Sequence, residues 1–426
     1  MTEDFLHFVW QFGLFERTNL KALTGEDIDI ISTGQHNTDS GPDFFNARIK
    51  INRIEWAGNV EIHIKSSDWK KHGHTNDKAY NNVILHVVSD YDADVFINEN
   101  QRIPTIKLNY NKILLENYKS LYGSVGKIPC SRHLNKINTD FLKFYLPSLA
   151  IERLEQKTQT IKKSLINNKF NWEETFYIAI ARNFGFRINS QPFTMLAESI
   201  PLKVLAKQKN NLLQIEAILF GQSGLVPKTS EHTYVKSLIG EYVFLKSKFS
   251  LTPLELSIWK YLRVRPLSFP SIRIAQFAVL IHQSSALLSK IIEQNELESL
   301  IKLFSLKASS YWDEHYDFDK PSPNEPKTLG NDSINTIIIN TVIPFLFLYG
   351  REKGKDEISE RALKFLELLP AEKNTIIKQF ADYNIKAKNA LESQSLIQLY
   401  NNYCIPRNCL KCQIGCKIIQ ATNKLI

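Results

Sequence analysis

The stretch GPDFFNARIKINRIEWAGNVEIHIK, residues 41–65, decides which fold the N-terminal part of the chain can adopt. Apolar and polar side chains alternate along Phe44–Ile51 and again along Val60–Ile64. Alternation with a period of two is the pattern of strands that bury one face. The two runs are close in sequence, so we expect a hairpin that turns near Asn52 and Arg53.

The register of this hairpin determines which polar side chains meet at its open end. With that turn, residue numbers across the ladder add to about 104–106, which places Asp43 opposite Glu61 or His63. We expect Gly58 to form a bulge that decides between these registers. In either register, carboxylate and imidazole groups from two strands converge at one end of the sheet.

Further elements are expected around the hairpin. Large apolar side chains recur at spacings of three and four over residues 2–16, which predicts a helix. Apolar runs at 83–88 and 95–97 predict two more strands, and the end of the polar segment 66–81 is a further candidate helix. The expected order α-β-β-α-β-β ends near Leu108 and gives an α/β domain with a mixed sheet over residues 1–115.

The remainder of the chain has a helical pattern. From about residue 140, apolar residues recur with a period near 3.6, interrupted at Pro and Gly. The expected helices include 253–263 and 271–305. The predicted fold class is α+β, in which the mixed-sheet domain precedes a large all-α domain. We expect a linker at 116–139, a basic helical domain at 140–402 and a C-terminal cysteine segment at 403–426.

The charge of the chain is distributed unevenly. Residues 1–110 hold 11 Lys and Arg against 16 Asp and Glu, a net charge of −5, whereas the remainder holds 42 against 28, a net charge of +14. The segment Lys246–Arg273 contains six basic residues and one acidic residue, Glu255. An acidic part joined to a basic part fits a protein that binds DNA or RNA and keeps its carboxylates for metal. The alternative is that lysine-rich helices are solvated surfaces.

Several classes of protein are not expected. The N-terminus MTEDFLHFVWQFGLF has acidic residues where a secretory signal needs Lys or Arg, so we expect a cytoplasmic protein. The longest apolar run, Ile337–Tyr349, is too short to cross a bilayer and contains Pro344, so we expect a core helix and no membrane partner. The segment GSVGK, residues 123–127, lacks the spacing and the Ser or Thr of a nucleotide-binding loop.

The polar residues of the hairpin are candidates for a catalytic site. Glu61, His63 and Lys65 alternate with apolar residues and therefore share one strand face. Asp43 and Glu61 would bind a divalent ion such as Mg²⁺ or Mn²⁺, and His63 would act as base or ligand. Lys65 would neutralise developing charge. The alternative is an ordinary solvated strand face with a turn aspartate after Gly-Pro.

Five of the ten histidines lie between residues 36 and 86. His72 and His74, in DWKKHGHTND, have the His-x-His spacing of some metal sites, so both are candidate ligands. A small-molecule metallohydrolase that uses His63 with this pair is therefore one alternative function. His86 lies inside the apolar strand VILHVV, where a hydrogen-bonded core histidine is the simpler interpretation.

The C-terminal cysteines carry the strongest chemical signal. Cys404, Cys409, Cys412 and Cys416 fall within thirteen residues, whereas Cys130 stands alone. A Cys-x2-Cys turn lets two thiolates bind one metal, and four nearby thiolates complete a site for Zn²⁺ or an iron–sulfur cluster. Clustered cysteines without a secretory signal favour metal binding over disulfides. The alternative is a group of buried free cysteines.

Six motifs resemble those of a known family. They are GPDF (41–44), WAGNVEIH (56–63), DWKKHGH (68–74), YNNVILHVV (80–88), RPLSFPSIRIAQFA (265–278) and YCIPRNCLKCQIG (403–415). They are similar to an uncharacterised bacterial family that carries a domain-of-unknown-function label. The resemblance spans nearly the whole chain and implies no established activity.

A looser resemblance concerns mechanism. Nucleases of the PD-(D/E)xK superfamily have an Asp that opens a strand after Pro and a Glu-x-Lys on the next strand. Pro42-Asp43 and the run Glu61–His63 are similar to this motif, and Tyr80 resembles the tyrosine of a later helix. The resemblance implies a restriction-endonuclease-like sheet and metal-dependent cleavage. His63 stands where the motif has lysine, so it would be a base or a ligand, or would mark an inactive site.

Some nucleases of that superfamily hold a [4Fe–4S] cluster with one distant cysteine and three near the C-terminus. Cys130 with three of the four terminal cysteines would resemble that arrangement. One cysteine is then surplus, so either Cys130 or Cys416 is expected to be a spectator.

The leading hypothesis is therefore a metal-dependent nuclease that acts on DNA or RNA. The basic helices would hold phosphates, with Tyr261 and Phe269 available for base stacking. A second hypothesis is a non-catalytic nucleic-acid-binding or scaffold protein with a structural metal or iron–sulfur centre.

Overall fold

The computed structural model describes residues 1–98, 101–284 and 286–421, which form two compact units. The N-terminal unit consists of Met1–Tyr145, Asp382–Ile385 and Leu399–Ile426, and the helical unit consists of Leu146–Ala381 and Lys386–Gln398. The C-terminal cysteines thus belong to the same unit as the sheet. The exact domain boundaries expected from the sequence stay a prediction.

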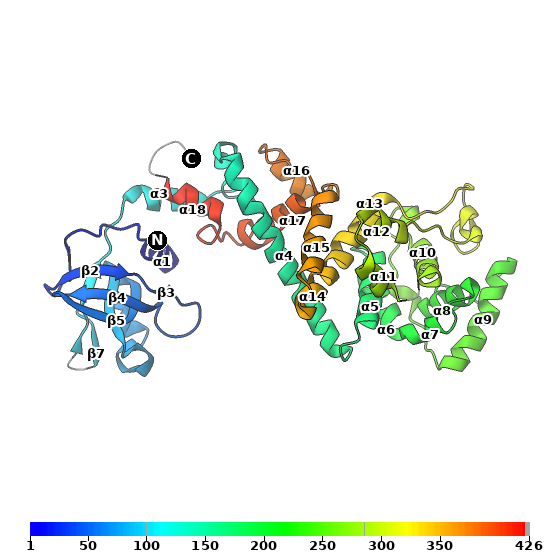
Figure 1. The fold of residues 1–426 in the computed structure, drawn as a ribbon, viewed down its shortest axis with the longest axis horizontal. Helices are drawn as coiled ribbons and strands as arrows, with labels where there is room; N and C mark the ends of the chain where they lie inside the picture. The colour runs from blue at the N-terminus through cyan, green and yellow to red at the C-terminus, as the bar shows by residue number, and fades with distance from the viewer. Residues whose placement is uncertain (99–100, 285, 422–426) are drawn as a thin grey trace. The chain divides into compact units, whose positions relative to one another are not determined.

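A mixed sheet forms the centre of the N-terminal unit (Figure 1). Its strands are β1 (Leu20–Lys21), β2 (Asp27–Ser32), β3 (Gln35–His36), β4 (Phe44–Ile51), β5 (Ile54–Lys65), β6 (Val83–Asp90) and β9 (Thr105–Lys107). The strand order is β1-β2-β4-β5-β6-β9, and β3 pairs with β4. Neighbours from β1 to β5 are antiparallel, whereas β5, β6 and β9 are mutually parallel. The expected α+β class with a mixed sheet is therefore confirmed.

The expected hairpin of β4 and β5 turns at the expected place. Asn52 and Arg53 have φ angles of 49° and 70°. These left-handed values are typical of a two-residue turn whose twist matches that of the strands. Asn52 also ties the turn to β2, because its Oδ1 accepts a hydrogen bond from the Asp27 amide at 3.0 Å.

A bulge in β4 sets the register at the open end of this hairpin. The pairing shifts between Ala47, which lies opposite Gly58, and Phe44, which lies opposite Val60. The extra residue is in β4, where Asn46 has a φ of 55°. The prediction that Gly58 forms this bulge is therefore wrong. Glycine at position 58 is needed for a different reason, since a Cβ there would lie 2.5 Å from a side-chain atom of Ile84.

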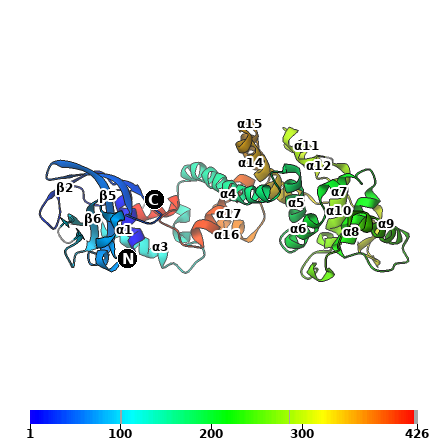
Figure 2. The ribbon, with the colours of Figure 1, turned by 90° about the horizontal axis from the view of Figure 1, so that it is seen from below.

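Helix α1 (Glu3–Gln11) packs against β5 (Figure 2). Its first turn contains Glu3 and Asp4, which the helix dipole favours at that position. The helix ends earlier than the expected residue 16, because Gly13 adopts a φ of 61° and terminates it.

A small second core lies where the chain crosses from β5 to β6. The crossover contains α2 (Asp68–Lys71) and the 3-10 turns η1 (His74–Asn76) and η2 (Lys78–Tyr80). Trp69 of α2 is buried there with Tyr80, Val83 and Ile97, next to the hairpin of β7 (Phe96–Asn98) and β8 (Gln101–Arg102). This core fixes the segment that carries His72 and His74.

Strand β2 and helix α3 are among the elements that were not expected from the sequence. Strand β2 has the polar sequence DIDIIS, yet Ile28 and Ile30 are buried on one face of the sheet. Helix α3 (Lys112–Tyr122) begins at the side chain of Asn111, which accepts a hydrogen bond from the Ile113 amide. Helix α3 packs beside α18 (Gln413–Gln420) in Figure 1.

The helical unit consists of packed helices and one short hairpin in the part of the chain that the structure describes. Helix α4 (Thr139–Asn167) enters this unit at Leu146. The other helices are α5 (Trp172–Phe184), α6 (Ser190–Ser199), α7 (Leu202–Ala206), α8 (Leu212–Ser223), α9 (Thr233–Phe249), α10 (Pro270–Gln283), α11 (Leu287–Glu293), α12 (Leu297–Leu303), α13 (Asn331–Ile337), α14 (Ile343–Lys353), α15 (Asp356–Leu368), α16 (Thr375–Ala381) and α17 (Ala390–Leu399). The hairpin consists of β10 (His315–Asp317) and β11 (Lys320–Pro321).

One helical stretch, Asn331–Lys353, is long and apolar enough to cross a membrane by length and composition. It consists of α13, a π-helical turn and α14, and 72% of its most apolar window is buried inside the unit. Burial of that kind is typical of the core helix of a globular domain.

Two expected helices differ in the structure. The segment 253–263 contains only the 3-10 turn η4 (Leu256–Ile258), because neighbouring helices bind its backbone. The Leu254 amide donates to the carbonyl of Gln222, and the Lys260 amide donates to Asn189 Oδ1. The helix expected over 271–305 consists of α10, α11 and α12.

The basic segment 246–273 is not a continuous charged surface. Arg273 is buried and donates hydrogen bonds to Gln276 and Ser333. Tyr261 and Phe269 are partly buried and contact each other edge to face. Their expected role in base stacking thus loses support, because neither ring is fully exposed.

We predict that substitutions on the exposed face of the sheet affect stability little, whereas substitutions on its buried face lower stability. Ile49→Ala should lower the local free energy of unfolding by about 2–5 kcal/mol, because Ile49 is completely buried. Lys50→Ala, the exposed neighbour on the same strand, should change it by less than about 0.5 kcal/mol. Hydrogen exchange of peptides from β4 and β5 measures both. Equal effects of the two substitutions would contradict the assigned inner face.

Candidate functional site

The open end of the β4–β5 hairpin holds two carboxylates side by side. The bulged register places Asp43 next to Glu61, which is one of the two expected alternatives. The Asp43 amide donates to Glu61 Oε2 at 3.1 Å, and the Ile62 amide donates to Asp43 Oδ2 at 2.9 Å. Each carboxylate therefore fixes the backbone of the other strand.

Three histidines converge next to these carboxylates, and two of them contact Glu61. His63 of β5, His72 after α2 and His74 of η1 each offer a ring nitrogen, and these nitrogens all lie within 4.8 Å of one another. Glu61 Oε1 lies 3.5 Å from His63 Nε2 and 3.3 Å from His74 Nε2, and His63 Nε2 lies 3.1 Å from His72 Nδ1. We call Glu61, His63, His72 and His74 the histidine cluster.

The spacing within the histidine cluster is that of ligands around one metal ion. Ligands bound about 2.0–2.2 Å from Zn²⁺ at tetrahedral angles lie roughly 3.3–3.6 Å from each other. The distances from Glu61 Oε1 to the two histidines fall at this separation. The alternative is a chain of hydrogen bonds that runs from His86 through His63 to His72. His74 Nε2 lies outside that chain and contacts Glu61 Oε1 at 3.3 Å.

Burial keeps the central imidazoles neutral. Burial lowers the pKa of His63 to about 2, and the neighbouring His86, His72 and His74 contribute to this. Burial also lowers the pKa of His86 to about 3. The pKa of Glu61 is raised by burial, and further by Asp43, although its contact with His74 acts in the opposite direction. Neutral imidazoles retain the lone pairs that a metal ion requires.

His86 supports the cluster from behind. It is completely buried in β6, and its Nε2 lies 2.9 Å from His63 Nδ1. If His63 Nδ1 carries the proton and donates a hydrogen bond to His86 Nε2, His63 Nε2 keeps its lone pair for a metal ion. The expected core position of His86 is thus compatible with an orienting role.

Aromatic rings enclose the cluster. Tyr80 stacks on His74 with ring centroids 3.8 Å apart, and the edge of Trp69 meets His63, His74 and His86. The Trp69 indole donates to the Phe96 carbonyl at 3.1 Å. Burial, followed by the charge of Glu61, raises the pKa of Tyr80 to about 12. These contacts limit the rotation of the histidines and exclude water from their inner side.

His7 of α1 joins the site at its outer edge. Its Nε2 lies 3.2 Å from Asp43 Oδ2. Burial alone would lower the pKa of His7, but hydrogen bonding to Asp43 and its negative charge outweigh burial and raise that pKa. The sequence signal for His7 is weak, since His7 is a single polar residue in a helix whose other face is apolar. The acid that it approaches, Asp43, lies just before β4, and sequence spacing does not reveal this contact.

A cleft of about 310 Å³ opens beside His7. Its wall includes Asp4, His36, Tyr118 and Tyr122, together with Pro406, Arg407, Asn408, Leu410 and Lys411 of the C-terminal segment. Lys411 is exposed, and its charge contributes to lowering the pKa of His36, after burial and the charge of His7. The cleft therefore combines positive charge with aromatic surface next to the Asp43–His7 pair.

Lys65 does not reach the histidine cluster. Its side chain is exposed, and its ammonium group acts electrostatically on Asp92. Its backbone amide donates to Asp68 Oδ2 at 3.0 Å. The structure thus separates Lys65 from Asp43 and Glu61, although all were expected to share one site.

The predicted cysteine ligands lie in the C-terminal segment of the same unit. Cys404, Cys409 and Cys412 are buried, whereas Cys416 is partly exposed. Cys130, which with Cys416 was one of the two candidate spectators, is buried as well.

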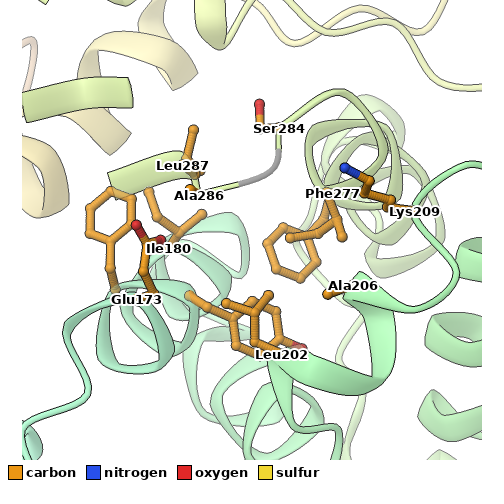
Figure 3. A pocket seen from close by; sticks show the side chains of 12 residues that line it. Glu173, Ile180, Leu202, Ala206, Lys209, Phe277, Ser284, Ala286 and Leu287 are labelled. Carbon is orange, nitrogen blue, oxygen red and sulfur yellow. The ribbon is translucent and has the colours of Figure 1, made fainter. Parts of the chain in front are cut away.

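A separate hollow of about 260 Å³ lies in the helical unit (Figure 3). It is mainly apolar, with Ile180, Leu202 and Phe277 among its lining residues. The Glu173 carboxylate at its edge accepts hydrogen bonds from the amides of Leu288 and Ser289 and so caps α11. The position of Glu173 is therefore explained by its role at the start of α11.

Comparison with known proteins gives one family. The family model described as "Protein of unknown function (DUF2851)" matches residues 3–375. No curated protein matches the chain. No solved structure matches it either.

The neutral histidines predict acid sensitivity. His63 and His86 have lowered pKa values in the folded chain, so their contribution to stability is complete above the unfolded value of about 6.5 and is lost as pH falls toward 3. Metal-free protein should lose up to about 3 kcal/mol per pH unit in that window, because two groups protonate on unfolding. His86→Leu should reduce this slope by about half.

The urea midpoint of the N-terminal unit between pH 8 and pH 4 measures this slope. His282→Ala, in the helical unit, serves as the control and should leave the slope unchanged. If stability falls with pH as steeply in His86→Leu as in the parent chain, His63 and His86 are not a buried neutral pair.

Proposed function

The chain belongs to the family described as a protein of unknown function (DUF2851), and we propose that its N-terminal unit is a metal-dependent hydrolase of nucleic-acid phosphodiesters. The observation that carries this proposal is the convergence of His63, His72 and His74 within 4.8 Å beside Glu61. Such a set of ligand atoms, largely enclosed by aromatic side chains and open at exposed His72, suits an ion with a free coordination position.

The composition of the cluster favours a particular class of metal. Imidazole nitrogens suit Zn²⁺, Fe²⁺ or Ni²⁺, whereas Mg²⁺ and Mn²⁺ prefer carboxylates and water. We therefore propose Zn²⁺ or a similar transition-metal ion in place of the Mg²⁺ or Mn²⁺ expected from the sequence. When bound, such an ion lowers the pKa of a water ligand and stabilises negative charge on a phosphoryl group.

The Asp43–His7 pair supplies proton transfer in this proposal. His7 Nε2 lies 3.2 Å from Asp43 Oδ2, and the pKa of His7 is raised overall, so the protonated ring can donate to a leaving oxygen. Asp43 orients His7 and holds it on the side of the cleft. The His63 and His74 rings cannot take this role, because both are buried inside the cluster.

The cleft supports a phosphodiester substrate. His7, His36 and Lys411 can hold a phosphate, and Tyr118 and Tyr122 offer aromatic rings for a base. The positive charge of the residues after 110 would add non-specific attraction for a polyanion.

The similarity to PD-(D/E)xK nucleases gains support from the placement of the carboxylates. Asp43 precedes β4, and Glu61 and His63 lie on the adjacent β5. We therefore propose a restriction-endonuclease-like core in which His63 has become a ligand. No residue would then take the part of that superfamily's lysine, because the Lys65 side chain is exposed and acts on Asp92.

We predict that Glu61→Gln and His74→Ala each lower metal affinity by at least about tenfold, because each removes a ligand or its charge. Cleavage of single- or double-stranded DNA or RNA in the presence of Zn²⁺, Mn²⁺ or Mg²⁺ should fall by a similar or larger factor. Glu55→Gln, at the exposed end of the same strand, should leave both unchanged. Isothermal titration and cleavage of labelled oligonucleotides measure the two effects.

Salt-sensitive binding of nucleic acid without cleavage by any of these ions would contradict the hydrolase and favour a non-catalytic binding protein. If the parent chain neither binds nor cleaves these oligonucleotides, nucleic acid is not the substrate.

We also predict that Lys411→Ala weakens oligonucleotide binding at the cleft while metal affinity stays unchanged. KM should rise several-fold, and the slope of log binding constant against log salt should fall by about one, because one phosphate contact is removed. Lys417→Ala, an exposed lysine on α18 outside the cleft lining, is the matched control. Equal effects of the two substitutions would show that the cleft is not the binding surface.

A further inference from the structure

The apolar hollow of about 260 Å³ in the helical unit is built by four helices, α5, α7, α10 and α11 (Figure 3). Its apolar lining includes Phe176, Tyr177, Ile180, Leu202, Phe277 and Leu287. All of these except Leu202 are buried. An apolar hollow of this size costs stability while it is empty, because its lining side chains lack packing partners on one side.

The hollow reaches the surface beside the end of α7. Ala206, the last residue of that helix, and Lys209 both line the hollow and are exposed. His282 Nδ1, at the end of α10, donates a hydrogen bond to the Lys209 carbonyl at 2.6 Å. This bond holds the segment after α7 against α10. A small molecule can therefore enter the hollow without separating the helices that form it.

Tyr177 brings a polar group to the lining. Its ring stacks on that of Phe277, with the ring centroids 5.8 Å apart. The Tyr177 hydroxyl is buried and has no hydrogen-bond partner in the part of the chain that the structure describes. Burial, followed by the charge of Glu174, raises the pKa of Tyr177, so the hydroxyl keeps its proton and can donate it in a hydrogen bond. Because a buried hydroxyl without a partner destabilises the fold, an acceptor on a ligand would stabilise it.

Two charged side chains lie on opposite sides of the hollow (Figure 3), Glu173 and Lys209. The Glu173 carboxylate already accepts hydrogen bonds from the amides of Leu288 and Ser289 and from the Ser289 hydroxyl. The Lys209 ammonium group forms no ion pair with the described residues. The hollow therefore has a negative side whose acceptor atoms are occupied and a positive side whose donors are free for a ligand.

These features specify the chemistry of a complementary ligand. The aromatic rings of Phe176, Tyr177 and Phe277 favour an aromatic body over a polar one. An apolar cavity of ~150 Å³ binds benzene, so this hollow accommodates roughly ten non-hydrogen atoms. A carboxylate would be attracted by Lys209 and repelled by Glu173, and its oxygens could accept hydrogen bonds.

We propose that this hollow is a binding site for a small aromatic carboxylate, with the ring among the apolar side chains and the carboxylate on the side of Lys209. The site belongs to the helical unit and does not depend on the hydrolase proposed for the N-terminal unit. Since the lining comes from α5, α10 and α11, a bound ligand would hold these three helices together.

The first test compares three probes that share one apolar body and differ in charge. Phenylpropionate, phenylpropanol and phenylpropylamine are titrated into the full-length protein by calorimetry. Phenylpropionate should bind most tightly and phenylpropylamine most weakly, because the free charged group at the hollow is a cation. Absence of phenylpropionate binding, or affinity no higher than that of the alcohol, would overturn the proposal.

The role of Lys209 has a matched control on the neighbouring helix. Lys209→Ala should weaken phenylpropionate binding by about two- to fivefold, the range of an exposed ion pair, and leave phenylpropanol binding unchanged. Lys203→Ala, which removes an exposed lysine of α7 outside the lining, should change neither. Equal losses in the two variants would mean that Lys209 does not bind the carboxylate.

The Tyr177 hydroxyl gives effects of opposite sign. Tyr177→Phe should raise the melting temperature of the ligand-free protein by about 2–4 °C, because it removes a buried polar group that has no partner. The same substitution should weaken phenylpropionate binding by about two- to tenfold, since it removes a donor. A lower melting temperature with unchanged binding would show that the hydroxyl serves the fold and not a ligand.

The location of the bound probe is tested in two ways. Ala206→Trp should abolish phenylpropionate binding without loss of stability, because residue 206 is exposed at the opening of the hollow. In the parent chain, phenylpropionate should slow hydrogen exchange in peptides from α5, α10 and α11 and leave peptides from β4 and β5 unchanged. Binding that persists in Ala206→Trp, or protection confined to the strands, would place the probe elsewhere and overturn the proposal.

Discussion

The arrangement of the N-terminal site depends on the pairing of β4 with β5. Side chains alternate between the two faces of a sheet, so a shift of one residue would move every polar group to the opposite face. The bulge at Asn46 introduces that shift once, just before the strand end, and leaves the rest of the hairpin in its own register. As a result Asp43 meets the backbone of Ile62, and Glu61 meets the backbone of Asp43.

The same pairing creates an energetic problem that a metal ion would solve. A carboxylate and several imidazoles are removed from water between β5, β6 and the crossover, and buried polar groups are costly unless they have partners. The contacts among Glu61, His63, His74 and His86 satisfy part of this requirement, but His86 Nδ1 has no hydrogen-bond partner in the described part of the chain. A protein that needed only a stable sheet would gain more from apolar residues at these positions. We therefore interpret the histidine cluster as functional.

The sequence predicted the parts of the site that depend on local pattern. Alternation of apolar residues was sufficient for the β4–β5 hairpin and for the approach of Asp43 to Glu61. The nearness of His72 and His74 to His63 was only an alternative, because it depends on how Trp69 packs in the crossover. His7 was missed, because α1 packs on the sheet through contacts distant in sequence. Lys65 was included because alternation gives the strand face, but alternation does not give the direction of a long exposed side chain.

Anomalous X-ray scattering from crystals of the full-length chain grown with Zn²⁺ tests the central claim most directly. The histidine cluster should show a zinc peak about 2.0–2.2 Å from ring nitrogens of His63, His72 and His74, with a Glu61 oxygen at a similar distance. Collection at the zinc edge and below it would separate this ion from iron at the cysteines. A fully occupied zinc peak at the cysteines, with no peak among the three histidines, would contradict a metal-dependent site in the sheet.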